Sequence, residues 1–77
     1  MTTHVHSLAH LKPGESGVID KLTSHEETAL RLMQIGLCPG EPVKVLRLAP
    51  LGGPMDIEVM GYRLAIRRAD AEHILLR

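Results

Sequence analysis

Three histidines near the N-terminus, His4, His6 and His10, have a spacing that could support metal chemistry. Imidazole nitrogens bind zinc, nickel, copper and ferrous ions. In a strand His4 and His6 would share a face, and in a helix His6 and His10 would do so. No nearby carboxylate or cysteine completes a tetrahedral set, so we expect surface histidines on a flexible N-terminal segment over residues 1–7. Adventitious binding of a transition metal is the alternative.

One cysteine and two adjacent glutamates are the next candidates for covalent or acid–base chemistry. A catalytic thiol needs a positive environment and a base, and no pattern of that kind surrounds Cys38. We therefore expect Cys38 to be a buried or half-buried structural thiol. Glu26 and Glu27 are neighbours in a predicted helix, so their side chains diverge. Capping and the helix dipole explain them without an active site.

Three arginines, Arg63, Arg67 and Arg68, could form a small cationic patch, and the exposed face of a strand explains them about as well. The Gly-Gly-Pro segment at 52–54 has neither the spacing of a phosphate-binding loop nor the helix that must follow one. The sequence holds no Ser/His/Asp arrangement, zinc signature or dinucleotide fingerprint. The residues alone therefore favour a non-enzymatic interaction domain.

One segment has the pattern of an amphipathic helix. Ser24 followed three residues later by Glu27 is the capping-box pattern, and Gly36 suits a left-handed C-terminal cap. These signals predict one helix at about residues 25–35. The side chains that recur at helical spacing, and are expected to face the core, are Ala29, Leu30, Met33 and Leu37.

The rest of the chain consists of short segments separated by glycine and proline, which is typical of strands and tight turns. Between Val45 and Leu46 the apolar residues change parity within one predicted strand, as a β-bulge would produce. Bulges bend strands, so a small sheet can close. We therefore expect an all-β fold, a small barrel with the helix inserted after the first strand. The expected strands cover 17–22, 42–49, 55–60, 62–67 and 74–76, with a helical turn at 68–72.

Composition excludes several classes of function. The 77 residues fit one domain, and nine basic side chains balance nine acidic ones. Nucleic-acid-binding domains usually carry a basic excess, and grooves for bases or proline-rich peptides need several aromatic rings, whereas Tyr62 is the only one here. No apolar run approaches the roughly 20 residues that cross a bilayer. We expect a cytoplasmic protein with no nucleic-acid partner and no direct membrane insertion.

Three motifs, in order along the chain, resemble one family. The string LRLMQIGLCPG at residues 30–40 resembles the R-L-x-x-L-G-[LIM]-x-P-G signature of the ferrous iron transport protein A (FeoA) family. The opening at 8–19 and the closing run at 61–74 are similar to the start and end of that family. Ile35 stands where leucine is common. The N-terminal histidines are not part of the family pattern, so no metal role carries over to them.

The resemblance implies an SH3-like barrel domain at residues 8–77. We also expect no cofactor, apart from an adventitious transition metal. The resemblance also implies a cytoplasmic accessory protein of bacterial ferrous iron uptake. Its partner would be the membrane permease of that system (FeoB), whose cytoplasmic part carries a GTP-binding domain. The same domain occurs at the C-terminus of iron-dependent transcriptional repressors. Because only a few residues precede Leu8, we expect the stand-alone transport form.

A binding domain without chemistry of its own must act by favouring one state of its partner. We expect an exposed aliphatic patch at the contact, because methionine adapts well to partner surfaces. Two alternatives stay open: a transition-metal carrier that uses the N-terminal histidines, and a GTPase-activating protein that supplies an arginine to the phosphates. A homo-oligomer also stays open. The expected partner-binding residues are Leu32 on the outer helix face, Leu51 in the Gly/Pro loop, Met60, Arg63 and Arg67.

Overall fold

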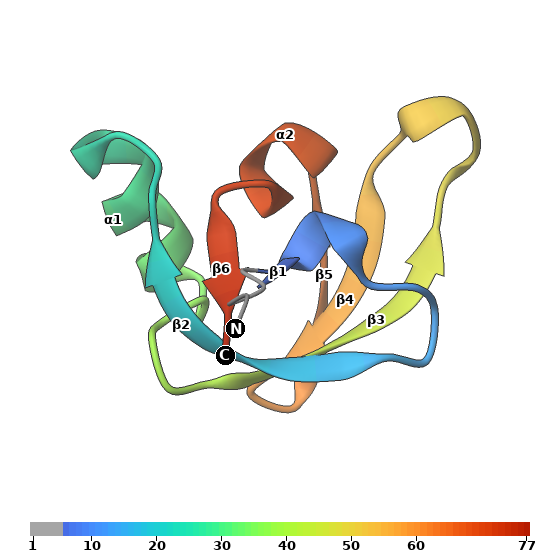
Figure 1. The fold of residues 1–77 in the computed structure, drawn as a ribbon, viewed down its shortest axis with the longest axis horizontal. Coiled ribbons are helices and arrows are strands. Elements are labelled where there is room, and N and C mark those ends of the chain that lie inside the picture. Colours follow the sequence, from blue (N-terminus) through green and yellow to red (C-terminus); the bar gives the residue numbers. More distant parts are fainter. Residues whose placement is uncertain (1–5) are drawn as a thin grey trace, which may run out of the picture.

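The computed structural model describes residues 6–77 and shows one curled antiparallel sheet (Figure 1). Within those residues the sheet has six strands, in the order β1-β6-β2-β3-β4-β5. The expected all-β fold with one main helix is confirmed. The strands are β1 (His6–Ser7), β2 (Ser16–Leu22), β3 (Pro42–Leu48), β4 (Met55–Val59), β5 (Tyr62–Ile66) and β6 (Ile74–Leu76).

Four helical segments connect the strands. The main helix α1 (Glu26–Gln34) follows β2, in agreement with the predicted helix, and the short α2 (Arg68–Ala71) confirms the predicted helical turn. The other two helical segments are the 3-10 turns η1 (Leu8–His10) and η2 (Pro50–Gly52). Both α1 and α2 lie at the upper end of the molecule in Figure 1. No helix within the described residues is long and apolar enough to cross a membrane.

The sheet curls because two of its ladders are interrupted. The register of β3 against β4 shifts between Val45 and Arg47, at the place where the sequence changes parity, so the predicted bulge is confirmed. A second shift occurs in β2, between Ile19 and Lys21, where it pairs with β6. A bulge increases the local twist and bends the strand. The two shifts therefore let six short strands enclose a core.

The core is aliphatic, as the lack of aromatic residues requires. Met55, Ile57 and Val59 are buried along β4, as their alternation predicted. Because successive side chains of a strand point to opposite faces, the intervening residues of β4 face outward. The complete set of buried apolar residues is Leu8, Ala9, Ile19, Leu32, Leu37, Val43, Val45, Met55, Ile57, Val59, Ile66, Ala71, Ile74 and Leu76.

The rotation of α1 differs from the one expected. Leu32 is buried, with only 3% of its surface exposed, whereas Leu30 is 50% exposed. The expected placement of Leu32 on the outer face, and of Leu30 toward the core, was therefore wrong. The helix has nine residues and carries apolar side chains around much of its circumference, so spacing alone could not fix its inward face. Leu37, just beyond the helix, is fully buried as expected.

The start of α1 also differs. His25 is the N-cap residue and makes no side-chain capping hydrogen bond, so the predicted capping box at Ser24 does not form. Among the described residues the Ser24 hydroxyl oxygen is buried and has no hydrogen-bond partner. A desolvated hydroxyl without a partner costs about 1–3 kcal/mol. Ser24 is therefore a source of instability and not a helix cap.

The change Ser24→Ala tests this difference by the sign of its effect. Loss of a true N-cap would lower the free energy of unfolding by about 1 kcal/mol. Because the hydroxyl has no partner, we expect the free energy of unfolding to stay the same or to rise by up to about 1 kcal/mol. Urea denaturation followed by circular dichroism measures it. The exposed Ser16→Ala serves as the control, and a loss confined to Ser24→Ala would restore the capping interpretation.

The ordered domain begins earlier than expected. His6 and Ser7 form β1, which pairs with β6 through His6 opposite Leu76 and Ser7 opposite Leu75. Ser7 is buried. A boundary at residue 8 is therefore too late, and residues 6 and 7 belong to the sheet instead of a flexible segment. A strand of two residues shows no periodicity in a sequence, which explains the difference.

Candidate functional site

The C-terminal end of α1 meets the β4–β5 hairpin at a single glycine. Gly36 has a φ of +105°, which confirms the predicted left-handed cap. The Tyr62 hydroxyl donates a hydrogen bond to the Ile35 carbonyl oxygen at 2.7 Å. A Cβ atom placed on Gly36 would lie 2.9 Å from the Tyr62 hydroxyl oxygen and 3.1 Å from the Met60 sulfur. The hairpin therefore packs directly on the helix end and fixes its position.

Three apolar side chains remain exposed around this contact. The exposed fractions are 37% for Ile35, 59% for Met60 and 44% for Tyr62. We call these three residues the junction cluster. Met60 was expected to be exposed, and it is. No pattern in the sequence indicated the contact of Tyr62 with Ile35, because 27 residues separate them.

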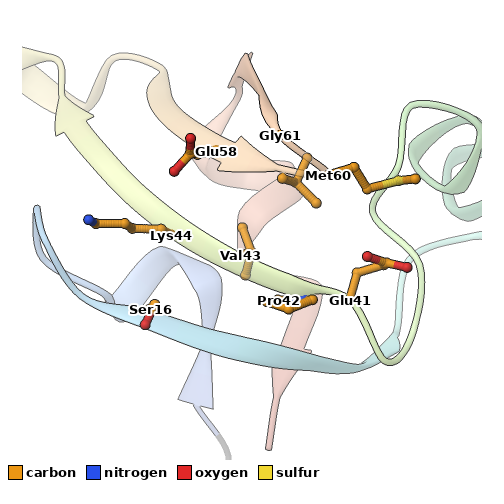
Figure 2. A pocket seen from close by; sticks show the side chains of 9 residues that line it. Ser16, Glu41, Pro42, Val43, Lys44, Glu58, Met60 and Gly61 are labelled. Atoms are coloured by element: carbon orange, nitrogen blue, oxygen red, sulfur yellow. The ribbon is translucent and has the colours of Figure 1, made fainter.

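A shallow groove of about 320 Å³ runs beside Met60 over the outer face of the sheet (Figure 2). Lys44 of β3 stands opposite Ser16 of β2 on one side and Glu58 of β4 on the other. A cation and an anion therefore lie next to each other on an open face. Such a surface can orient a polar partner but does not enclose a substrate. Its lining residues are Ser16, Glu41, Pro42, Val43, Lys44, Glu58, Val59, Met60 and Gly61.

A second hollow of about 320 Å³, which we call the α1–β5 groove, lies between the helix and the edge strand. Leu32 and Ile66 are its buried residues, and Ala65 is exposed in it. Arg31 and Arg67 are exposed and lie along the same groove. The groove therefore combines apolar surface with two cations. Ile35 and Asp70 complete the lining.

The predicted aliphatic patch is not one surface. Leu51 is fully exposed and lies in η2 with a φ of +60°. In Figure 1 the yellow turn that contains it stands on the opposite side of the molecule from α1. Leu32 is buried, so of the three predicted leucine and methionine residues only Met60 lies exposed at the helix–hairpin contact. The structure thus separates Leu51 from Met60 and removes Leu32 from the surface.

Some of the arginines are exposed cations, and others make contacts that hold elements of the fold together. Arg63 and Arg67 are exposed. Arg68 is half-buried, and its guanidinium donates to the Ala9 carbonyl oxygen at 3.4 Å, which ties α2 to η1. Arg47 pairs with Asp56 at 3.4 Å on the open surface, where such a pair contributes at most about 1 kcal/mol. The cationic surface near β5 is therefore formed by Arg63 and Arg67, and Arg68 is structural.

Among the described histidines, His10 is engaged by its neighbour Ser7. Nδ1 of His10 accepts a hydrogen bond from the Ser7 backbone N–H at 3.4 Å and lies 3.0 Å from the Ser7 hydroxyl oxygen. Between residues 6 and 77, no three His, Cys, Asp or Glu side chains are placed to hold a metal ion. His4 lies outside the described residues, so metal binding by the three histidines together stays a prediction.

Cys38 lies beside the end of α1 and is half-buried. Its thiol donates to the Met33 carbonyl oxygen at 3.3 Å. This contact gives the half-buried thiol a structural role, as expected from the sequence. Cys38 therefore supports the helix end next to the junction cluster.

A curled antiparallel sheet of six short strands with one inserted helix is the architecture of a small SH3-like domain. The sequence model of the FeoA domain matches residues 6–77. The chain therefore belongs to the FeoA family, as its motifs indicated.

Solved structures agree with this assignment. A crystal structure of the iron uptake regulatory protein FeoA is 31% identical, with a TM-score of 0.87, and the match covers 96% of this chain and 97% of that one. A Stenotrophomonas maltophilia FeoA crystallised with zinc and described as a prokaryotic SH3 domain protein is 26% identical. Its TM-score is 0.76, and the match covers 94% of this chain and 89% of that one. The expected SH3-like fold is confirmed.

One curated relative is a much longer protein. It is an Fe(2+) transport protein A/Fe(2+) transporter FeoB fusion protein from Porphyromonas gingivalis, 30% identical to this chain over 67 residues. The match covers 87% of this chain and 8% of the fusion protein. The present chain thus spans less than a tenth of that relative.

Proposed function

We propose that this protein is a cytoplasmic accessory component of bacterial ferrous iron uptake, which binds the cytoplasmic part of a FeoB-type permease and modulates its activity. The observation that supports this most directly is the relative in which a FeoA-type segment and an Fe(2+) transporter form one chain. A covalent link replaces an encounter between separate chains by an intramolecular contact. The same contact made between two chains is the proposed role here.

The proposed mechanism is differential binding. An accessory protein shifts a permease toward one conformation only by binding that conformation more tightly than the others. The junction cluster and the α1–β5 groove offer exposed apolar surface and cations for such a contact. Both are held in place by the bond from Tyr62 to Ile35. A preformed surface loses little entropy on binding, which favours a rigid contact.

The proposal predicts saturable binding to the soluble cytoplasmic part of the permease from the same cell. We expect a dissociation constant in the micromolar range, about −8 kcal/mol, as for a small and transient interface. Isothermal titration calorimetry measures it. In cells, removal of this protein should lower the initial rate of Fe(II) uptake, and the wild-type chain should restore it. Binding weaker than about 1 mM, together with unchanged uptake, would reject the proposed role.

The same purified components separate the two alternatives. A GTPase-activating protein would accelerate GTP hydrolysis by the permease domain, and this acceleration would be lost with Arg31→Ala, Arg63→Ala or Arg67→Ala. A metal carrier would bind Fe(II) or Zn(II) without the permease and lose that binding when residues 1–10 are removed. Because β1 lies within residues 1–10, the metal test also needs His4→Ala, which replaces no residue of the described sheet.

A further inference from the structure

Strand β5 lies at the edge of the sheet. The register of its hairpin with β4 determines which of its backbone N–H and C=O groups point away from β4. Within the described residues β4 is the only strand neighbour of β5. The connecting turn consists of Met60 and Gly61, with φ of +52° and +84°, which is the type I′ geometry. In a two-residue hairpin the flanking residues, here Val59 and Tyr62, exchange both backbone hydrogen bonds, and every second pair beyond them does so too.

The intervening residues of β5 therefore direct their backbone groups away from β4. Arg63 stands opposite Glu58 and Ala65 opposite Asp56, so both belong to pairs without backbone hydrogen bonds to each other. No turn, loop or cap hydrogen bond within residues 6–77 uses the N–H or C=O of Arg63 or Ala65. Unpaired groups of this kind are a template for another strand. The free edge of β5 thus offers two N–H donors and two C=O acceptors.

The side chains around this edge differ on its two faces. On the inward face Ile35 is exposed in the α1–β5 groove, beside the buried Leu32 and Ile66. Arg63 lies on the outward face and Arg67 at the rim of the groove, and neither forms an ion pair within the described residues. A strand added to this edge would point alternate side chains to these two faces. Its side chains would therefore meet apolar surface and cations in turn.

We propose that the free edge of β5 accepts an extended segment of the partner as a seventh strand, with apolar and acidic side chains in alternation. This inference rests on the proposed function and names the surface and the recognition chemistry of that contact. Main-chain hydrogen bonds give affinity in such β-augmentation, and the pockets for alternate side chains give specificity. The apolar side chains enter the α1–β5 groove, and the acidic ones face Arg63 and Arg67.

Charge favours a different protein over a second copy of this chain as the occupant. If β5 paired with β5 of another copy, the exposed arginines of both strands would lie along one shared ladder. Like charges across a strand pair are destabilising. Arg31 adds a third cation at the groove, and Asp70 is the single acidic residue in its lining. The complementary ligand is therefore an acidic strand, which this chain does not present at β5.

Replacement of one backbone donor tests the strand pairing. Ala65→Pro removes an N–H that β4 does not use, and proline is tolerated on the free side of an edge strand. We expect the affinity for the soluble cytoplasmic part of the permease to fall about tenfold or more, because one hydrogen bond is lost and the ring blocks the incoming strand. Ala65→Thr keeps the N–H and suits a strand, so it should retain at least about half of the wild-type affinity.

Two further measurements keep the test decisive if Ala65→Pro folds poorly. In the complex, the amide protons of Arg63 and Ala65 should gain protection from hydrogen exchange, whereas those of Tyr62 and Leu64, already bonded to β4, should change little. The double change Arg63→Glu with Arg67→Glu should weaken binding about tenfold or more and reduce its salt dependence. Lys21→Glu, a charge reversal at an exposed cation on β2, is the control and should bind like the wild type.

The outcomes distinguish strand addition at β5 from the proposed binding to the permease. If the wild type binds but Arg63 and Ala65 gain no protection and the β5 variants bind normally, strand addition at β5 is rejected while the proposed function stands. If the wild type does not bind the permease part at all, both are rejected. A concentration-dependent dimer that is lost with Ala65→Pro would identify a second copy as the occupant and overturn the acidic-strand proposal.

Discussion

Replacing Leu32 by glutamine is expected to lower the free energy of unfolding by about 3–5 kcal/mol. Leu32 is 3% exposed and belongs to the aliphatic core. The change removes buried apolar contacts and places an amide among side chains that cannot bond to it. A domain of 77 residues has a total stability of about 4–12 kcal/mol. The Leu32→Gln protein should therefore lose at least about a quarter of its stability, which thermal denaturation would show as a lower midpoint.

Met60→Gln is the matched control for this change. Met60 is 59% exposed, and exposed substitutions usually alter stability by less than about 0.5 kcal/mol. We therefore expect Met60→Gln to fold normally, so that any loss of iron uptake in this variant reports on binding. Loss of uptake with Leu32→Gln would report on folding. Equal stability of the two variants would contradict the burial of Leu32.

Replacing Gly36 by alanine is expected to lower the free energy of unfolding by about 2–4 kcal/mol. A side chain at a φ of +105° is strained, which costs about 1–3 kcal/mol. The new methyl group would also lie 2.9 Å from the Tyr62 hydroxyl oxygen, so that side chain must shift. The shift would weaken the hydrogen bond to Ile35. Urea denaturation measures the loss, and reduced tyrosine contacts in NMR spectra would report the displacement.

Gly40→Ala separates backbone strain from crowding. Gly40 has a similar φ of +94°, but nothing lies within 4 Å of the position of its Cβ atom. We expect this change to cost only the backbone strain of about 1–3 kcal/mol, and so less than Gly36→Ala. The difference between the two variants then measures the contact of the hairpin with the helix end. Equal losses would mean that the hairpin does not depend on that contact.

The strands could be predicted because strict alternation of apolar and polar residues allows only one face of a strand to be buried. In β4 the buried residues Met55, Ile57 and Val59 alternate with outward residues, and a shift by one would expose all three. The bulge was also predictable, because the apolar residues of β3 change from odd to even positions after Val45. The face of α1 could not be predicted, because apolar residues occur at too many positions in a short helix. Packing against the sheet, and not spacing, places Leu32 inside.

The candidate site was predictable only in its parts. The exposure of Met60 followed from its parity at the end of β4, and that of Arg67 from its parity beyond β5. Their neighbours did not follow, because the contact between Tyr62 and Ile35 joins elements distant in the sequence. The free edge of β5 depends on the strand order, which hydrophobic alternation does not encode. A sequence therefore reveals which residues are exposed sooner than which of them act together.

The pairing of β1 with β6 places the two ends of the described chain next to each other, with His6 opposite Leu76 (Figure 1). A polypeptide joined to either end thus starts from the same pair of strands, and the hydrogen-bonding edge of β5 is left unused. A short flexible tether supplies an effective concentration of about 1 mM. A contact of millimolar affinity suffices in a fused protein, whereas separate chains at cellular concentrations need a tighter one. Fused and separate forms of this fold should therefore differ in the strength of the contact they require while using the same surface.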